Sequence, residues 1–79
     1  MQHGADEAQA AFEQALRVAR DQQAKSLELR AATSLARLWG ERDRRAEARE
    51  LLAPVYGWFT EGFDTADLKE AKELLDALT

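Results

Sequence analysis

The chain contains no cysteine and a single histidine, His3. Disulfides, zinc–thiolate sites and thiol nucleophiles are therefore excluded, and no serine has a histidine partner that the sequence would place beside it. Paired acids such as Glu47 and Glu50 lack the histidine three residues further on that carboxylate metal sites on helices use. We therefore expect no catalytic residues, no metal and no cofactor, and hence a protein that is not an enzyme.

The sequence also lacks a long apolar run and an excess of positive charge. No apolar run approaches the roughly 18 residues of a membrane span, and the N-terminus has no basic segment followed by an apolar one. The net charge is −4, whereas phosphate contacts need clustered lysine and arginine. We expect a protein or peptide partner, no nucleic acid, no membrane and a cytoplasmic location.

Residues that favour strands are scarce, because isoleucine is absent and only two valines occur among 79 residues. Sixteen alanines and one proline give the chain a strongly helical composition instead. The fold class we predict is all-α. We expect residues 1–5 to be disordered and residues 6–79 to form one helical domain.

Apolar residues recur at steps of three and four along four stretches, which predicts four amphipathic helices. Their expected bounds are 6–22, 24–39, 45–60 and 66–78. Gly40 and Gly62 are expected to end the second and third helices, and Thr65 or Asp64 to cap the fourth. The stripe of the second helix is wide, starting at Leu27, as expected for a helix flanked on two sides.

Pro54 lies inside the third predicted helix and leaves two alternatives. The helix could stop at Ala53 and restart at Pro54, because proline suits the first turn of a helix. It could instead continue with a kink, because proline removes one hydrogen bond and clashes with the preceding turn. The apolar spacing stays in phase through Phe59, which favours the kinked single helix. Trp58 lies out of phase with this stripe, which predicts that part of its ring is exposed.

Two of these helices share a spaced triplet of a small, a bulky and an apolar residue. The two copies are forty residues apart, and they are Ala8, Phe12 and Ala15, and Ala48, Leu52 and Val55. A period of this length indicates stacked helix pairs rather than a closed domain.

The second and third helices together resemble a tetratricopeptide repeat. The matching residues are Ala32, Leu35, Ala36 and Trp39 in the first helix of the pair and Ala48, Leu52 and Val55 in the second. The family spacing of twelve between the two small residues is kept, from Ala36 to Ala48. Ala32, Ala36 and Trp39 stand where the family usually has tryptophan, glycine and tyrosine. The period is about six residues longer than the usual 34.

Residues 28–39 and 45–72 further resemble the C-terminal repeat region of large bacterial signalling proteins, in which an ATPase module precedes a helical repeat array. The resemblance implies about one and a half repeats plus a C-terminal capping helix, and a protein–protein interaction module from a larger signalling or regulatory protein. No ATPase or nucleotide-cyclase motif is present. The alternative is a structural or oligomerisation segment without its own ligand.

The resemblance also implies that the first helix of each pair lines a groove. Arg30, Thr33 and Arg37 lie on one face of that helix, and two arginines can hold an acidic peptide by forked hydrogen bonds. The alternative is that both arginines pair with nearby acids on the surface and bind nothing.

The first helix offers a candidate self-association face. One neighbouring helix cannot cover Phe12, Leu16 and Val18 together, and an exposed apolar patch tends to find a partner. We therefore hypothesise that the isolated chain forms a two-fold homodimer through Phe12 and Leu16.

Overall fold

The computed structural model describes residues 3–59 and 65–79, with side chains from Glu7 onward. Four helices, α1 (His3–Asp21), α2 (Lys25–Glu41), α3 (Arg45–Trp58) and α4 (Ala66–Leu78), account for nearly all of these residues. No strand occurs among them. The predicted all-α fold is therefore confirmed.

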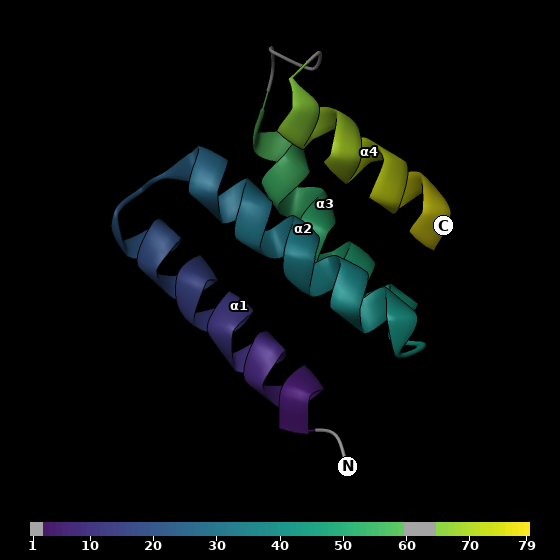
Figure 1. Cartoon of the computed structure of the whole chain (residues 1–79). Helices are drawn as coiled ribbons and strands as arrows, with labels where there is room; N and C mark the ends of the chain where they lie inside the picture. Colours follow the sequence, from purple (N-terminus) through teal and green to yellow (C-terminus); the bar gives the residue numbers. More distant parts are fainter. Residues whose placement is uncertain (1–2, 60–64) are drawn as a thin grey trace.

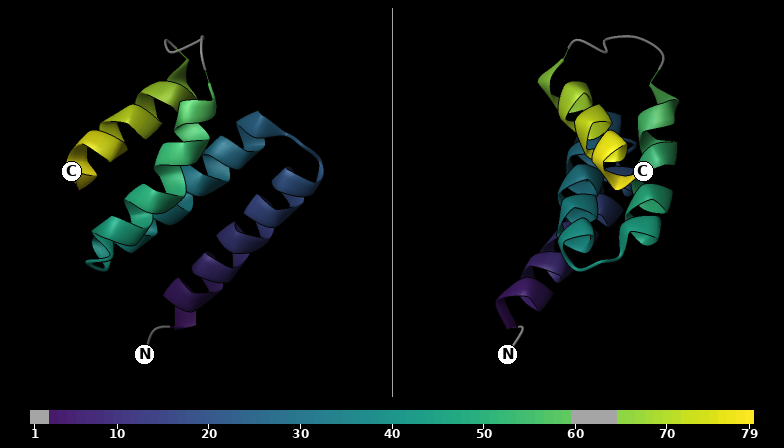
Figure 2. Two further views of the ribbon diagram at one scale, coloured as in Figure 1. Left: turned by 180° about the vertical axis from the view of Figure 1, so that it is seen from behind. Right: turned by 90° about the vertical axis from the view of Figure 1, so that its right-hand side faces the viewer.

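Helix α2 lies at the centre of the structure and contacts each of the other three helices. Among the described helices, α1 contacts α2 alone. Figure 1 shows α1 and α4 on opposite sides of α2, and the two further views place α3 behind α2 (Figure 2). Helices α2 and α4 run in the same direction, whereas α1 and α3 run opposite to α2 (Figure 1).

The core forms where α2 meets its neighbours. Its largest fully buried side chains are Leu29, Leu35 and Leu52. Four alanines are 0% exposed, and their small side chains allow close approach of the helices: Ala32, Ala36, Ala48 and Ala71. The sequence had assigned Leu35, Leu52 and these alanines to inward-facing stripes, and their burial confirms that assignment.

The turns after α1 and α2 have the same geometry. Gln23 and Asp43 are the non-glycine residues with positive φ, at 55° and 64°, among the described residues. The amide of the next residue donates to a carbonyl five residues back, from Ala24 to Ala19 at 2.8 Å and from Arg44 to Trp39 at 2.9 Å. This hydrogen bond is the Schellman closure of a helix C-terminus, and the two turns lie twenty residues apart.

The prediction that Gly40 ends the second helix is wrong. Gly40 lies inside α2, and Asp43 takes the left-handed position that a glycine was expected to fill. A tertiary contact explains why position 40 is a glycine, because a Cβ on Gly40 would lie 3.1 Å from Leu78 Cδ2. This glycine gives the end of α4 room to pack.

The remaining bounds differ from the sequence-based ones in part. Helix α1 already begins at His3, so residues 3–5, expected to be disordered, are helical. Helix α3 runs through Pro54, so the single-helix alternative is correct, but it ends at Trp58 rather than Thr60. Gly62 and Asp64 lie outside the described residues. The bounds of α4 are confirmed, and Leu68 N–H donates to the Thr65 hydroxyl at 3.4 Å as its cap.

Candidate functional site

The predicted groove residues Arg30 and Arg37 face α4 and form ion pairs with it. Arg30 Nε lies 4.0 Å from Asp67 Oδ1, and Arg37 Nη2 lies 3.3 Å from Glu70 Oε2. About half or more of the surface of each of these four side chains is exposed. The arginines thus have the acidic neighbours that the alternative interpretation expected, and an acidic peptide would have to compete with them.

Thr33 lies between these arginines but is only 2% exposed. Its hydroxyl donates to the Leu29 carbonyl at 2.7 Å, so its proton already has an acceptor within α2. A small polar hollow of about 240 Å³ lies between α2 and α4, lined by Arg30, Thr33, Ser34, Asp67 and Glu70. The structure therefore brings Arg30 and Thr33 together at the α2–α4 interface, and Arg37 joins this interface through its ion pair with Glu70.

The fold buries one of the two predicted self-association residues and leaves the other partly exposed. Leu16 is 5% exposed and belongs to the core, so its side chain is not available to a second copy, contrary to the hypothesis. Phe12 is half-buried, and Val18 is 43% exposed. The expectation that a single neighbour cannot cover all three side chains is confirmed.

An apolar hollow of about 480 Å³ opens between α1 and α2 beside Val18. We call it the α1–α2 hollow, and it is lined by Ala15, Val18, Ala19, Leu27, Arg30, Ala31 and Ser34. Leu27, which the periodicity had placed in the inward stripe of its helix, is 50% exposed here. The helix is flanked on two sides as predicted, but Leu27, at the start of its stripe, is left half exposed beside this hollow.

A second opening separates α1 from α3, two helices that do not contact each other. It has a volume of about 410 Å³, with Leu35 and Trp39 of α2 between Arg17 of α1 and Leu51 of α3. Trp39 Nε1 is buried there and has no hydrogen-bond partner among the described residues. Arg44 lies 4.6 Å from the centre of the Trp39 ring. Acidic and basic side chains both line this opening, so it favours neither an anion nor a cation.

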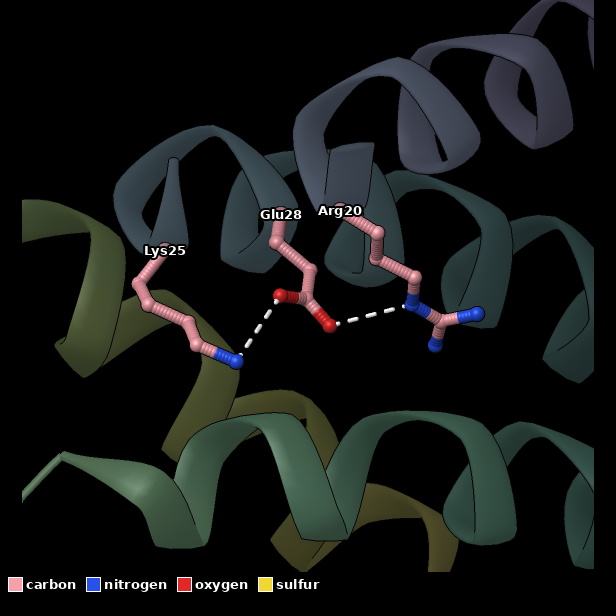
Figure 3. Close-up of polar contacts among 3 residues, drawn as sticks. All are labelled: Arg20, Lys25 and Glu28. Carbon is pink, nitrogen blue, oxygen red and sulfur yellow. Dashed lines mark hydrogen bonds and ion pairs between the residues drawn. The ribbon is translucent and has the colours of Figure 1, made fainter. Parts of the chain in front are cut away.

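Sequence reasoning missed the buried carboxylate of Glu28, shown in Figure 3. Arg20 Nε lies 3.1 Å from Glu28 Oε2, and Lys25 Nζ lies 3.3 Å from Oε1 (Figure 3). Both oxygens thus have a cationic donor, as a buried charge requires. Glu28 precedes Ala32 by four residues on the buried stripe of α2, and this spacing could have revealed it.

The Arg20–Glu28–Lys25 group ties three helices together. Arg20 comes from the last turn of α1 and Lys25 opens α2. Lys25 Nζ also lies 5.2 Å from the centre of the Trp58 ring of α3. Trp58 is 57% exposed, which confirms the prediction from its phase. These contacts fix the geometry of the α1–α2 turn.

The paired acids do not form a metal centre in the described part of the chain. No group of three or more potential ligands occurs there. Arg44 forms a bidentate pair with Glu47, with Nη2–Oε2 at 2.6 Å and Nε–Oε1 at 3.0 Å. The hydrogen bonds from Arg44 lower the pKa of the Glu47 carboxyl, and those to Glu47 raise the pKa of the Arg44 guanidinium.

None of the helices that the structure describes is long and apolar enough to cross a membrane. No protein-family model, curated protein or solved structure matches this chain.

Proposed function

We propose that the chain is a protein–protein interaction module of the tetratricopeptide type, without enzymatic activity. In this proposal α2 and α3 form one helix pair, α1 is the second helix of a preceding pair, and α4 caps the end. The order of contacts supports it, because α1 packs only on α2 while α2 also packs on α3 and α4. The repeated turn at Gln23 and Asp43 supports it as well.

The α1–α2 hollow is the observation that supports binding of another protein. Val18 and Leu27 are two of the three large apolar side chains that stand exposed among the described residues, and they share this one depression. Contiguous apolar surface on a small protein marks an interaction site more often than isolated exposed residues do. The origin in a larger bacterial signalling protein is proposed from the sequence resemblance.

Direct binding tests this function. Proteins captured on the immobilised chain are purified and titrated against it by calorimetry, and the core variant Leu52→Ala serves as the control for binding to unfolded chain. A partner that binds the folded chain but not this variant supports an interaction module. Recovery of further copies of the chain alone would support the structural or oligomerisation alternative and contradict the proposal.

A further inference from the structure

Helix α1 is attached to the rest of the protein along a narrow contact. Among the described helices it packs on α2 alone, and two of its described side chains are buried, Leu16 and Ala19. All other apolar side chains that are buried among the described residues belong to α2, α3 and α4, which pack on one another. The core therefore lies almost entirely within these three helices.

Openings lie along both edges of the α1–α2 contact. The α1–α2 hollow lies on the edge toward α4, because Arg30 and Ser34 line both this hollow and the polar one beside α4. The opening on the other edge has Arg17 of α1 and Leu51 of α3 on its two sides. Since both edges are open, α2 is the one described helix that holds α1 in place.

Two side-chain hydrogen bonds hold the ends of α1. Arg42 Nη1 donates to Gln9 Oε1 at 3.3 Å near the start of the helix, and Arg20 Nε donates to Glu28 Oε2 at 3.1 Å in its last turn. The Glu28 side chain is only 8% exposed. A hydrogen bond between charged groups is stronger when one of them lies away from water, so Arg20–Glu28 is the main polar tie of α1.

The turn after α1 has the properties of a hinge. Gln23 has a φ of 55°, which is unfavourable for a residue with a Cβ, and release of α1 lets it leave this conformation. Hinges are loop residues that absorb such changes of backbone angle. Most of the stability of a protein helix comes from packing, so α1 loses its hydrogen bonds once it leaves α2.

We propose that α1 is a detachable helix, which opens from α2 as one unit about Gln23 while α2–α4 stay folded, with the Arg20–Glu28 pair as its latch. α1 supplies one wall of each of the two openings, so its release removes both at once. A partner that uses both walls of either opening binds the closed state alone, and its binding is thereby linked to closure of α1. The opening itself does not depend on what the chain binds.

Native-state hydrogen exchange of the whole 79-residue chain, followed by NMR over a series of low urea concentrations, tests this. We expect the amides of Leu16 and Ala19 to share one opening free energy and one urea dependence, both smaller than those of Leu52. Relative to intrinsic rates, they exchange at least about tenfold faster than Leu52. Equal protection in α1 and α3, or protection that rises steadily from the start of α1 as in end fraying, overturns the proposal.

A matched pair of glycine variants tests whether α1 opens separately. Ala11 of α1 and Ala53 of α3 are both exposed within helices, and α3 does not contact α1. Ala11→Gly destabilises only the closed state, so it speeds exchange of both Leu16 and Leu52 by about fivefold. Ala53→Gly destabilises the closed and the open state equally, so it speeds Leu52 alone. If Ala53→Gly also speeds Leu16, the four helices open together and the proposal fails.

A second pair of variants tests the latch. Arg20→Gln removes the tie to Glu28 and should speed exchange of Leu16 by roughly tenfold, as expected for a hydrogen bond to a charged group. Arg17→Gln, on the same helix, is the control and should leave it unchanged. Circular dichroism verifies that each variant is folded. Equal effects of the two substitutions would show that Arg20 does not latch α1.

Discussion

Gly40 of α2 and Leu78 of α4 are in such close contact that a methyl group at position 40 would lie 3.1 Å from Leu78 Cδ2. Leu78 is 6% exposed and closes the core at the end of the chain. The glycine therefore serves the packing of two parallel helices, although its sequence context resembles a helix terminus.

The first prediction concerns this contact. Gly40→Ala should change the free energy of unfolding by less than about 1 kcal/mol, because its gain in helix propensity offsets a small displacement of the Leu78 side chain. Gly40→Val should destabilise by about 1–3 kcal/mol through overpacking. Urea denaturation of both variants measures the difference. Equal stability of the two would show that Leu78 does not restrict position 40.

The second prediction concerns the core. Leu35→Ala and Leu52→Ala should each cost about 2–5 kcal/mol, which is comparable with the roughly 3–5 kcal/mol that a core of this size supplies. Both variants should be largely unfolded by circular dichroism. The half-exposed Leu27→Ala is the matched control and should change stability by no more than about 0.5 kcal/mol. A melting temperature lowered by only a degree or two at position 52 would contradict this account.

The third prediction concerns the left-handed residues of the two turns. Gln23→Gly should stabilise the chain by up to about 1 kcal/mol, because glycine adopts a positive φ without the steric cost of a Cβ. Asp43→Gly should gain less, since aspartate tolerates this conformation better than glutamine does. Urea midpoints compare the two, with Gln22→Gly, one residue away, as the control. A loss of stability in Gln23→Gly would argue against the positive φ.

The fourth prediction concerns pH. Hydrogen bonding to Arg44 lowers the folded-state pKa of Glu47 below its ordinary value of 4.5. The stabilisation from this pair is therefore fully present above pH 4.5 and is lost as the pH falls through the lowered value. Glu47→Gln should remove this part of the acid sensitivity.

Because the Arg44–Glu47 pair is exposed, the effect should be small and should weaken in about 1 M salt, where charges are screened over a few ångströms. Urea midpoints of the two proteins, measured at neutral pH and well below pH 4.5, should converge in acid. A constant difference across this range would show that the Glu47 charge does not contribute.

The four helices could be predicted from the sequence because helix formation depends on local periodicity. Apolar residues at steps of three and four placed Leu35, Leu52 and Ala71 on buried faces, and the structure buries them. The fourth helix was correct to the residue, since Thr65 supplies a cap that is local in sequence. The phase of Trp58 likewise indicated its exposure.

The candidate site depended on contacts between residues far apart in the sequence. Periodicity gives the face on which Leu16, Leu27 and Glu28 lie, but only the positions of the neighbouring helices decide which part of that face is covered. Leu16 is buried by α2, Leu27 lines the open hollow between α1 and α2, and Glu28 is buried between two cations.

The sequence by itself therefore determined the fold class, the number of helices and most of the core, because these follow from the 3.6-residue repeat of a helix and from its caps. Only the tertiary structure decided that Gly40 packs against Leu78, that Arg30 and Arg37 face the acids of α4, and that an apolar hollow stays open beside Val18. Each of these depends on the distance between two helices, which no local pattern specifies.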